Sequence, residues 1–445
     1  MATTNQTSPN RVQFMLRALQ HRNYRLFFGG QIVSLAGNWM TQIAMTWLVY
    51  RLTGSAWMLG LVGFSGQIPA FLLGPIAGVI VDRLPRHRLL VITQVAAMIQ
   101  SGLLAILTLT GVIDVWHIVV LIIVQGIINA FDIPARQAFV VEIVDNKDDL
   151  SNAIALNSSM FNLARLIGPA IGGILIAVVG EGWCFAFDSL SYIAVIGALL
   201  MMKVAPHVTE SKRGQAVQEL RDGWAYVVAS APISSILILL ACMSLFAMPY
   251  GVLMPIVASK TLGGGPNVLG FLMAASGFGA LCGALTLAAR TSIRGLGRNI
   301  PFCVAAFGVG LIGFGLSTNL YLSMALLWVM GFAGMMQMAS CNTILQTIVE
   351  DNKRGRVMSF YTMAFMGVMP FGSLGAGALA DNIGVSTTLM IGGAGCLAVA
   401  AWFGTRYPVL RDIVRPIYDQ LGIAPAIARG IEGAAELNTP PVKLA

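Results

Sequence analysis

The chain has 445 residues, of which 57% are hydrophobic and only 10% are charged, and its mean hydropathy is +0.78. So few charged residues cannot cover the surface of a water-soluble protein of this size. The composition therefore excludes an ordinary soluble enzyme or binding domain and indicates an integral membrane protein. The formal net charge of +8 is not accompanied by a basic arm with interleaved aromatic residues, so we expect no nucleic-acid partner.

Twelve apolar segments of membrane-spanning length follow one another along the chain. About 20 helical residues cross the roughly 30 Å hydrocarbon core of a bilayer, so each segment is predicted to be a transmembrane helix. The fold class predicted is an all-α integral membrane protein of twelve transmembrane helices in two six-helix halves. The predicted spans are 26–50, 57–81, 89–111, 116–138, 154–179, 182–202, 233–258, 267–289, 300–318, 320–345, 358–380 and 385–405.

A short repeat relates the two halves. The tripeptide Asp-Asn-Lys follows the fourth segment at 145–147 and the tenth segment at 351–353. Similarity across a six-helix interval is typical of transporters built from two six-span repeats, with the substrate site near the bilayer midplane between them. The predicted organisation is an N-terminal segment 1–25, an N-terminal half 26–202, a central linker 203–232, a C-terminal half 233–405 and a tail 406–445.

The basic residues predict the orientation, because Lys and Arg near helix ends are retained on the cytoplasmic side. Nearly all of them fall in alternate connections of the twelve-span arrangement. Only Arg51 and Lys260 fall on the other side, and Arg165 lies inside a segment. We predict a multi-pass protein of a bacterial inner membrane with both termini in the cytoplasm. No signal-peptide core precedes the first long segment, so that segment is expected to direct its own insertion.

Polar residues form stripes on the first and fourth predicted helices. Each stripe repeats at steps of three or four residues and so follows one helix face, which must turn away from lipid. We predict that the uncharged members line a substrate pathway, with hydrogen bonding between helices as the structural alternative. The charged pair is predicted to act as a cytoplasmic latch. The stripes are Gln31, Ser34, Asn38 and Gln42, then Gln125, Asn129, Asp132 and Arg136.

Two charges are embedded within the predicted spans. Arg165 lies about eleven residues into the fifth segment, roughly 16 Å along a helix and so near the midplane. A cation there costs at least ~2.5 kcal/mol unless it is hydrated or paired, so we predict that Arg165 belongs to the transport pathway. Asp188 lies in the sixth segment, closer to the outer end. A structural and a functional role are equally open for Asp188.

The connection after the second segment, GVIVDRLPRHR at 78–88, resembles the signature loop of the major facilitator superfamily, although Pro85 replaces the usual glycine. An acid with several arginines at the cytoplasmic surface can join the two halves through charge pairs and helix-end dipoles. The resemblance therefore implies a conformational latch. Its residues are Gly78, Asp82, Arg83, Arg86 and Arg88.

The fifth predicted helix contains GPAIGG at 168–173, which resembles a motif of the superfamily's exporters, and the eleventh contains GVMPFG at 367–372. Small residues let helix backbones approach, and proline removes an intrahelical donor, so both segments are predicted to bend or to pack tightly. The residues assigned to this helix-bend motif are Gly168, Pro169, Gly172, Gly173 and Pro370.

Segments at 37–39, 53–55, 130–136 and 354–359 are similar to the subgroup that includes enterobactin exporters and macrolide efflux proteins. The resemblance implies a secondary active transporter that exports a drug-like or siderophore-like amphipathic molecule by alternating access. A lysolipid flippase, an importer of the same fold, and a receptor or scaffold that does not transport are the alternatives. Coupling to protons stays open, because Ile122 and Asn38 occupy positions where relatives often carry an arginine and an acid.

Enzyme function is not expected. The sequence lacks the Gly-x4-Gly-Lys-(Ser/Thr) phosphate loop of an ATP-driven pump, a zinc-binding His-Glu-x-x-His and a Ser/His constellation in the spans. The six cysteines are scattered singly, which favours small apolar packing over disulfides or metal ligation. We therefore predict no catalytic residue, no metal and no cofactor. The expected partners are a small-molecule substrate and membrane lipid, with the protein itself a monomer.

Overall fold

The computed structural model describes residues 16–144, 147–204, 216–290 and 295–420, apart from a few side chains within helices, including that of Asp82. Regular structure in these ranges is helical, with no strand. The repeat residues 145 and 146 and the far ends of the chain lie outside the described residues, as does most of the segment between the halves.

Six long helices form the N-terminal half. The predicted fifth span begins earlier than expected, because polar residues from Lys147 onward continue the same helix. The helices are α2 (Arg22–Thr53), α3 (Ala56–Arg83), α4 (Arg86–Leu109), α5 (Val115–Ile143), α6 (Lys147–Val179) and α7 (Glu181–Met201).

The amphipathic helix α8 lies within the predicted linker 203–232, and two of the six spans of the C-terminal half that follows are interrupted. The seventh span comprises α9, α10 and the π-helical turn η2, and the eleventh comprises α14, the π-helical turn η3 and α15. The elements are α8 (Ala216–Ala229), α9 (Ala231–Phe246), α10 (Tyr250–Ile256), η2 (Val257–Thr261), α11 (Pro266–Ala288), α12 (Leu296–Leu316), α13 (Leu320–Ile348), α14 (Asp351–Thr362), η3 (Met363–Gly367), α15 (Met369–Ile383) and α16 (Val385–Gln420).

Eleven spans in the described residues are long and apolar enough to cross a membrane. The remaining long helix, α2, packs between α6 and α7 within the N-terminal half. Its lower apolarity has a direct cause, since it carries the polar stripe that begins at Gln31 and Ser34, both of which are buried. The twelve-helix prediction is consistent with this arrangement.

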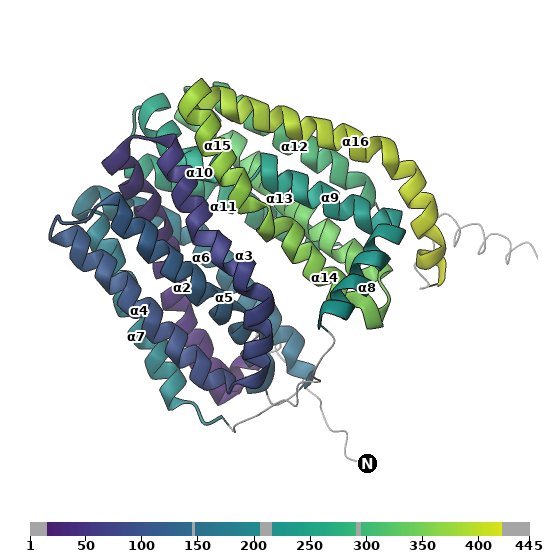
Figure 1. Cartoon of the computed structure of the whole chain (residues 1–445), viewed down its shortest axis with the longest axis horizontal. Helices are drawn as coiled ribbons and strands as arrows, with labels where there is room; N and C mark the ends of the chain where they lie inside the picture. The colour runs from purple at the N-terminus through teal and green to yellow at the C-terminus, as the bar shows by residue number, and fades with distance from the viewer. Residues whose placement is uncertain (1–15, 145–146, 205–215, 291–294, 421–445) are drawn as a thin grey trace, which may run out of the picture.

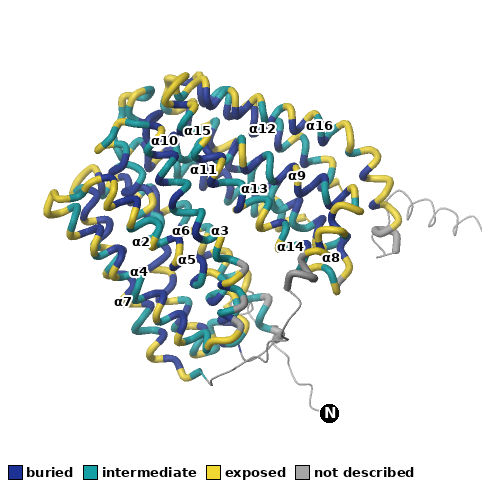
Figure 2. Tube along the Cα trace, viewed as in Figure 1, coloured by how far each residue is buried: buried dark blue, intermediate teal, exposed yellow. Residues whose placement is uncertain are grey.

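The two halves meet at one end and diverge toward the other (Figure 1). At the closed end, α3 packs on α15 and α6 packs on α11. At the open end, α14 packs on α8, α9 and α13, all in its own half. Buried residues run through both helix bundles (Figure 2). One cluster of buried apolar residues, which includes Leu48 and Leu240, spans both halves, and a second, which includes Phe27 and Phe139, lies within the N-terminal half.

Glycines let the backbones of the two halves touch at the closed end. A Cβ placed on Gly60 of α3 would lie 2.6 Å from the carbonyl oxygen of Ser373, and one on Gly377 would lie 2.7 Å from that of Ala56. On the other side of the interface, a Cβ on Gly173 would lie 2.8 Å from the Cα of Gly270. Any side chain at these glycines would force the helices apart.

Prolines explain the interruptions that the hydropathy pattern did not reveal. Pro249 follows the end of α9, and Pro255 lies within α10 just before the π-helical turn η2. In the eleventh span, η3 lies just before Pro370 at the start of α15. Proline removes a backbone donor, and a π-helical turn is a common site of helix bending.

The last helix, α16, continues to Gln420, past the end expected at 405. Leu410 and Val414 are buried, so one face of this extension still packs against the bundle. The loss of apolar character after 405 marks where the helix becomes amphipathic, and a hydropathy pattern cannot distinguish that change from a helix end.

Candidate functional site

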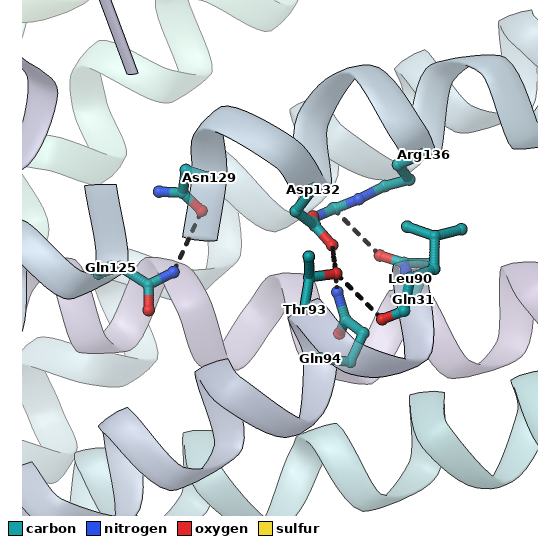
Figure 3. A network of polar contacts seen from close by, with 8 residues as sticks. All are labelled: Gln31, Leu90, Thr93, Gln94, Gln125, Asn129, Asp132 and Arg136. Atoms are coloured by element: carbon teal, nitrogen blue, oxygen red, sulfur yellow. Dashed lines mark hydrogen bonds and ion pairs between the residues drawn. The ribbon is translucent and has the colours of Figure 1, made fainter. Parts of the chain in front are cut away.

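A polar network lies inside the N-terminal half, where α2, α4 and α5 face one another (Figure 3). Asp132 of α5 is its centre and is only 2% exposed. One carboxylate oxygen accepts hydrogen bonds from Thr93 and Gln94 of α4, each at 2.8 Å. The other oxygen pairs with the guanidinium of Arg136, one turn along the same helix. Asp132 is thus a buried carboxylate neutralised within its own half.

Arg136 links this network to the first polar stripe. It donates to the side-chain oxygen of Gln31 of α2 at 3.3 Å, so a residue predicted in the pathway contacts one predicted in the latch. Asn129 lies one turn before Asp132 on α5, and its side-chain oxygen accepts a hydrogen bond from Gln125 at 3.1 Å. The hydrogen-bond partners described for the two stripes all belong to the N-terminal half.

The other three members of the α2 stripe differ in exposure. Ser34 is buried, Asn38 is half-buried and Gln42 is exposed. Beside Asn38, Trp39 makes an edge contact with Phe161 of α6, with ring centroids 5.8 Å apart. The stripe thus ends in an aromatic pair at the α2–α6 contact.

Arg165 lies one turn beyond Phe161 on α6, where α6 meets the other half. Its backbone oxygen would lie 3.1 Å from a Cβ on Gly277 of α11. Its side chain is half-buried and forms no ion pair or hydrogen bond with another described residue. A guanidinium at this depth without a protein acid needs water or an anionic ligand beside it.

The predicted latch loop turns tightly between α3 and α4. Arg86 lies 3.6 Å from the carboxylate of Glu142 at the end of α5. Arg83 and Arg88 are exposed, and a Cβ on Gly78 would meet open space. The side chain of Asp82 lies outside the described residues.

The exporter-like motif of α6 packs on both halves. Gly168 faces Trp39 of α2, where an added Cβ would lie 2.5 Å from the tryptophan Cβ, and Gly172 faces Met40. Gly173 and the carbonyl oxygen of Pro169 face α11 of the other half. The motif therefore packs α6 closely against α2 and α11, partners that the sequence motif alone did not assign.

Asp381 of α15 is a residue that the sequence patterns did not single out. Its carboxylate accepts hydrogen bonds from the backbone N–H of Ala56 at 3.1 Å and from the hydroxyl of Ser55 at 3.3 Å. It therefore caps the positive end of α3 across the interface between the halves. A signal was present, because Gly377-x3-Asp381 repeats the spacing of Gly78-x3-Asp82.

Within the described residues, no group of three or more His, Cys, Asp or Glu side chains is arranged to hold a metal ion. The candidate site residues comprise uncharged amides, an ion pair neutralised within the N-terminal half, and Arg165, which no described hydrogen bond or ion pair joins to that network. Two helix bundles joined at one end, with polar residues on facing helices, form the architecture of a secondary transporter.

The family model described as transmembrane secretion effector, within the major facilitator superfamily, matches residues 15–412. The chain belongs to this family, and the resemblance inferred from the motifs is confirmed. It is a multi-pass membrane transporter of small molecules and not an enzyme.

The chain is 27% identical over 384 residues to the staphyloferrin A transporter of Staphylococcus aureus, covering 85% of this chain and 95% of that one. It is 22% identical over 395 residues to macrolide efflux protein A of Streptococcus pyogenes, covering 86% and 96%. A bacterial homologue of the lysosomal transporter Spinster, solved in an inward-facing and unoccupied conformation, shares the fold with a TM-score of 0.64 at 13% identity, covering 90% of this chain and 98% of that chain.

Proposed function

We propose that the protein exports an amphipathic small molecule with an anionic group across the bacterial inner membrane by alternating access. Its relatives, which include the staphyloferrin A transporter and macrolide efflux protein A, support transport of a small molecule, and the anionic group is inferred from Arg165. The open end of the structure is the cytoplasmic end in this proposal, so the conformation described is inward-facing. The protein works as a monomer surrounded by lipid.

The observation that carries the proposal is the position of Arg165. This cation has no acidic partner in the described part of the chain, and it lies on the same helix face as Phe161, which contacts Trp39. A guanidinium can hold a carboxylate or similar anion with two hydrogen bonds, while aromatic rings bind the apolar part of the same molecule. Together they match an amphipathic anion better than a cationic drug.

Transport assays with inverted membrane vesicles test this function. Vesicles containing the protein should accumulate an amphipathic carboxylate faster than they accumulate its methyl ester or a cationic dye of similar size. Preference for the cationic dye would reject the substrate class. Uptake of the carboxylate into intact cells would identify an importer. Movement of lysolipid, without movement of the carboxylate, would identify a flippase.

The proposed orientation makes a separate prediction. In a variant lacking the six native cysteines, a cysteine at Thr318, between α12 and α13, should react with a membrane-impermeant reagent added outside intact cells. A cysteine at Ala225 on the exposed face of α8 should react only after the membrane is opened. The reverse pattern would show that both termini and the open end face outward.

The proposed cycle also assigns Asp381 to the gate at the closed end. Removing a helix cap costs about 0.5–2 kcal/mol, so Asp381→Ala should raise the outward-open population by roughly 2- to 30-fold. Alkylation from outside of a cysteine at the buried position Ser373 measures that population. Asn382→Ala is the matched control, because Asn382 is exposed and bonds only to its own helix. Equal alkylation in both variants would remove Asp381 from the gate.

A further inference from the structure

The N-terminal half contains a buried acid that the pathway described above does not use. Asp188 lies in the first half of α7 and is 2% exposed. One of its oxygens accepts a hydrogen bond from Ser101 of α4 at 2.9 Å. Among the described residues, no lysine or arginine lies within ion-pair distance of it, whereas Asp132 pairs with Arg136. An ionised carboxylate enclosed without a cation is costly in a membrane protein.

The second carboxyl oxygen of Asp188 has a specific neighbour. Asp188 Oδ1 and Thr41 Oγ1 of α2 are both buried, and neither has a hydrogen bond of normal geometry to a described group. Thr41 nevertheless lies close enough for its hydroxyl to interact with the Asp188 carboxyl. The Thr41 hydroxyl can donate to Oδ1 of the ionised carboxyl or accept from its protonated form, so the pair can be hydrogen-bonded both with the proton and without it.

The pocket also touches the helix that carries the first polar stripe. The Asp188 carboxyl fits against Gly37 of α2, where an added Cβ would lie 2.8 Å from Oδ1. Asn38, the next residue along α2, is a predicted pathway residue. Any shift of α2 during the transport cycle therefore changes the surroundings of Asp188 directly.

Tyr192 connects this pocket electrostatically to the open end. It lies one turn beyond Asp188 on α7, is buried, and interacts with Asp188, Asp132 and Arg136. Among the described residues, Tyr192 is the titratable group beside Asp188 on α7, and α4 and α2 contribute the hydroxyls of Ser101 and Thr41, while Asp132 and Arg136 of α5 act on Tyr192. Asp188 itself lies seven residues after Glu181, roughly 10 Å from the closed end.

We propose that Asp188 is the proton-binding site that couples export to the proton gradient. The O–H bond forms on Oδ1 with a proton taken from the outer solution, and it breaks with release of that proton to the cytoplasm. No other group needs to change its charge. Hydroxyl groups and a single carboxyl suit a proton better than a sodium ion, which requires several more oxygen ligands. The proposal rests on the transport function proposed above.

Infrared spectroscopy tests proton binding without any substrate. The purified protein should show the carbonyl stretch of a protonated buried carboxyl, and Asp188→Asn should remove that band. Glu181→Gln is the matched control, because this acid lies on the same helix but pairs with Arg51 at 2.8 Å. Persistence of the band in Asp188→Asn would overturn the proposal, even if the substrate were never found.

Transport in proteoliposomes tests coupling. Asp188→Asn should lose accumulation driven by a proton gradient but retain exchange of substrate across the membrane, which needs no net proton movement. Retention of gradient-driven accumulation would overturn the proposal, and so would loss of both activities, which would make Asp188 structural. Accumulation of substrate by the wild-type protein under a sodium gradient, but not under a proton gradient, would also overturn the proposal. No transport by wild type in either mode would instead reject the proposed function.

Discussion

Arg165→Ala should insert and fold normally and lose most transport. A hydrogen bond to a charged group contributes about 2 kcal/mol, so substrate affinity should fall roughly 30-fold. Arg165→Lys should retain only part of the wild-type substrate affinity, because lysine lacks the planar pair of donors that holds a carboxylate. Substrate binding to purified protein, measured beside the yield of folded protein, checks both expectations.

Arg411→Ala is the control for the Arg165 variants. Arg411 is 62% exposed on α16, where it pairs with Asp412, so its loss should leave transport unchanged. Wild-type transport by well-folded Arg165→Ala would make Arg165 a structural residue and remove the main support for an anionic substrate. Equal losses of transport in Arg165→Ala and Arg411→Ala would indicate that transport depends on the positive charge of the protein in general and not on Arg165 in particular.

Gly173→Leu should abolish transport by preventing closure of the closed end. The added side chain would start 2.6 Å from the carbonyl oxygen of Pro266 and 2.8 Å from the Cα of Gly270, so the halves must separate there. Overpacking of this kind costs about 1–3 kcal/mol, enough to reverse a balanced conformational equilibrium. External alkylation of a cysteine at Ser373 should rise accordingly.

Gly197→Leu separates this effect from a general cost of replacing a helical glycine. Gly197 lies in α7, and an added Cβ there would meet open space. This variant should transport normally and should not expose Ser373. If Gly173→Leu also left Ser373 protected, the α6–α11 contact would not control the closed end, and α3–α15 would have to do so alone.

The fold could be predicted because membrane spans depend on length and apolarity, which are read directly from sequence. The interruptions in the seventh and eleventh spans are harder to predict from the sequence. Pro249 and Pro255 marked the first, but a proline in an apolar run can also be tolerated in a continuous transmembrane helix. The extent of α16 was also missed, because its amphipathic end resembles a tail.

The candidate site was only partly predictable for a different reason. Helical periodicity placed Gln31 and Arg136 on inward-facing stripes, but it could not show that they bond to each other across 105 positions of chain. Arg165 was conspicuous because a charge at mid-span is rare. Aspartate is common on protein surfaces, so Asp381 does not stand out in the sequence. Only the packing of α15 on α3 gives it a partner in the other half.

Paired distance measurements test the alternating-access account most directly. Spin labels at Leu52 and Asn382 report the closed end, and labels at Arg83 and Asn352 report the open end; all four residues are exposed. Substrate and a proton gradient should lengthen the first distance and shorten the second in the same protein. If both distances stayed fixed during active transport, or changed in the same direction, the two halves would not rock about a shared central site.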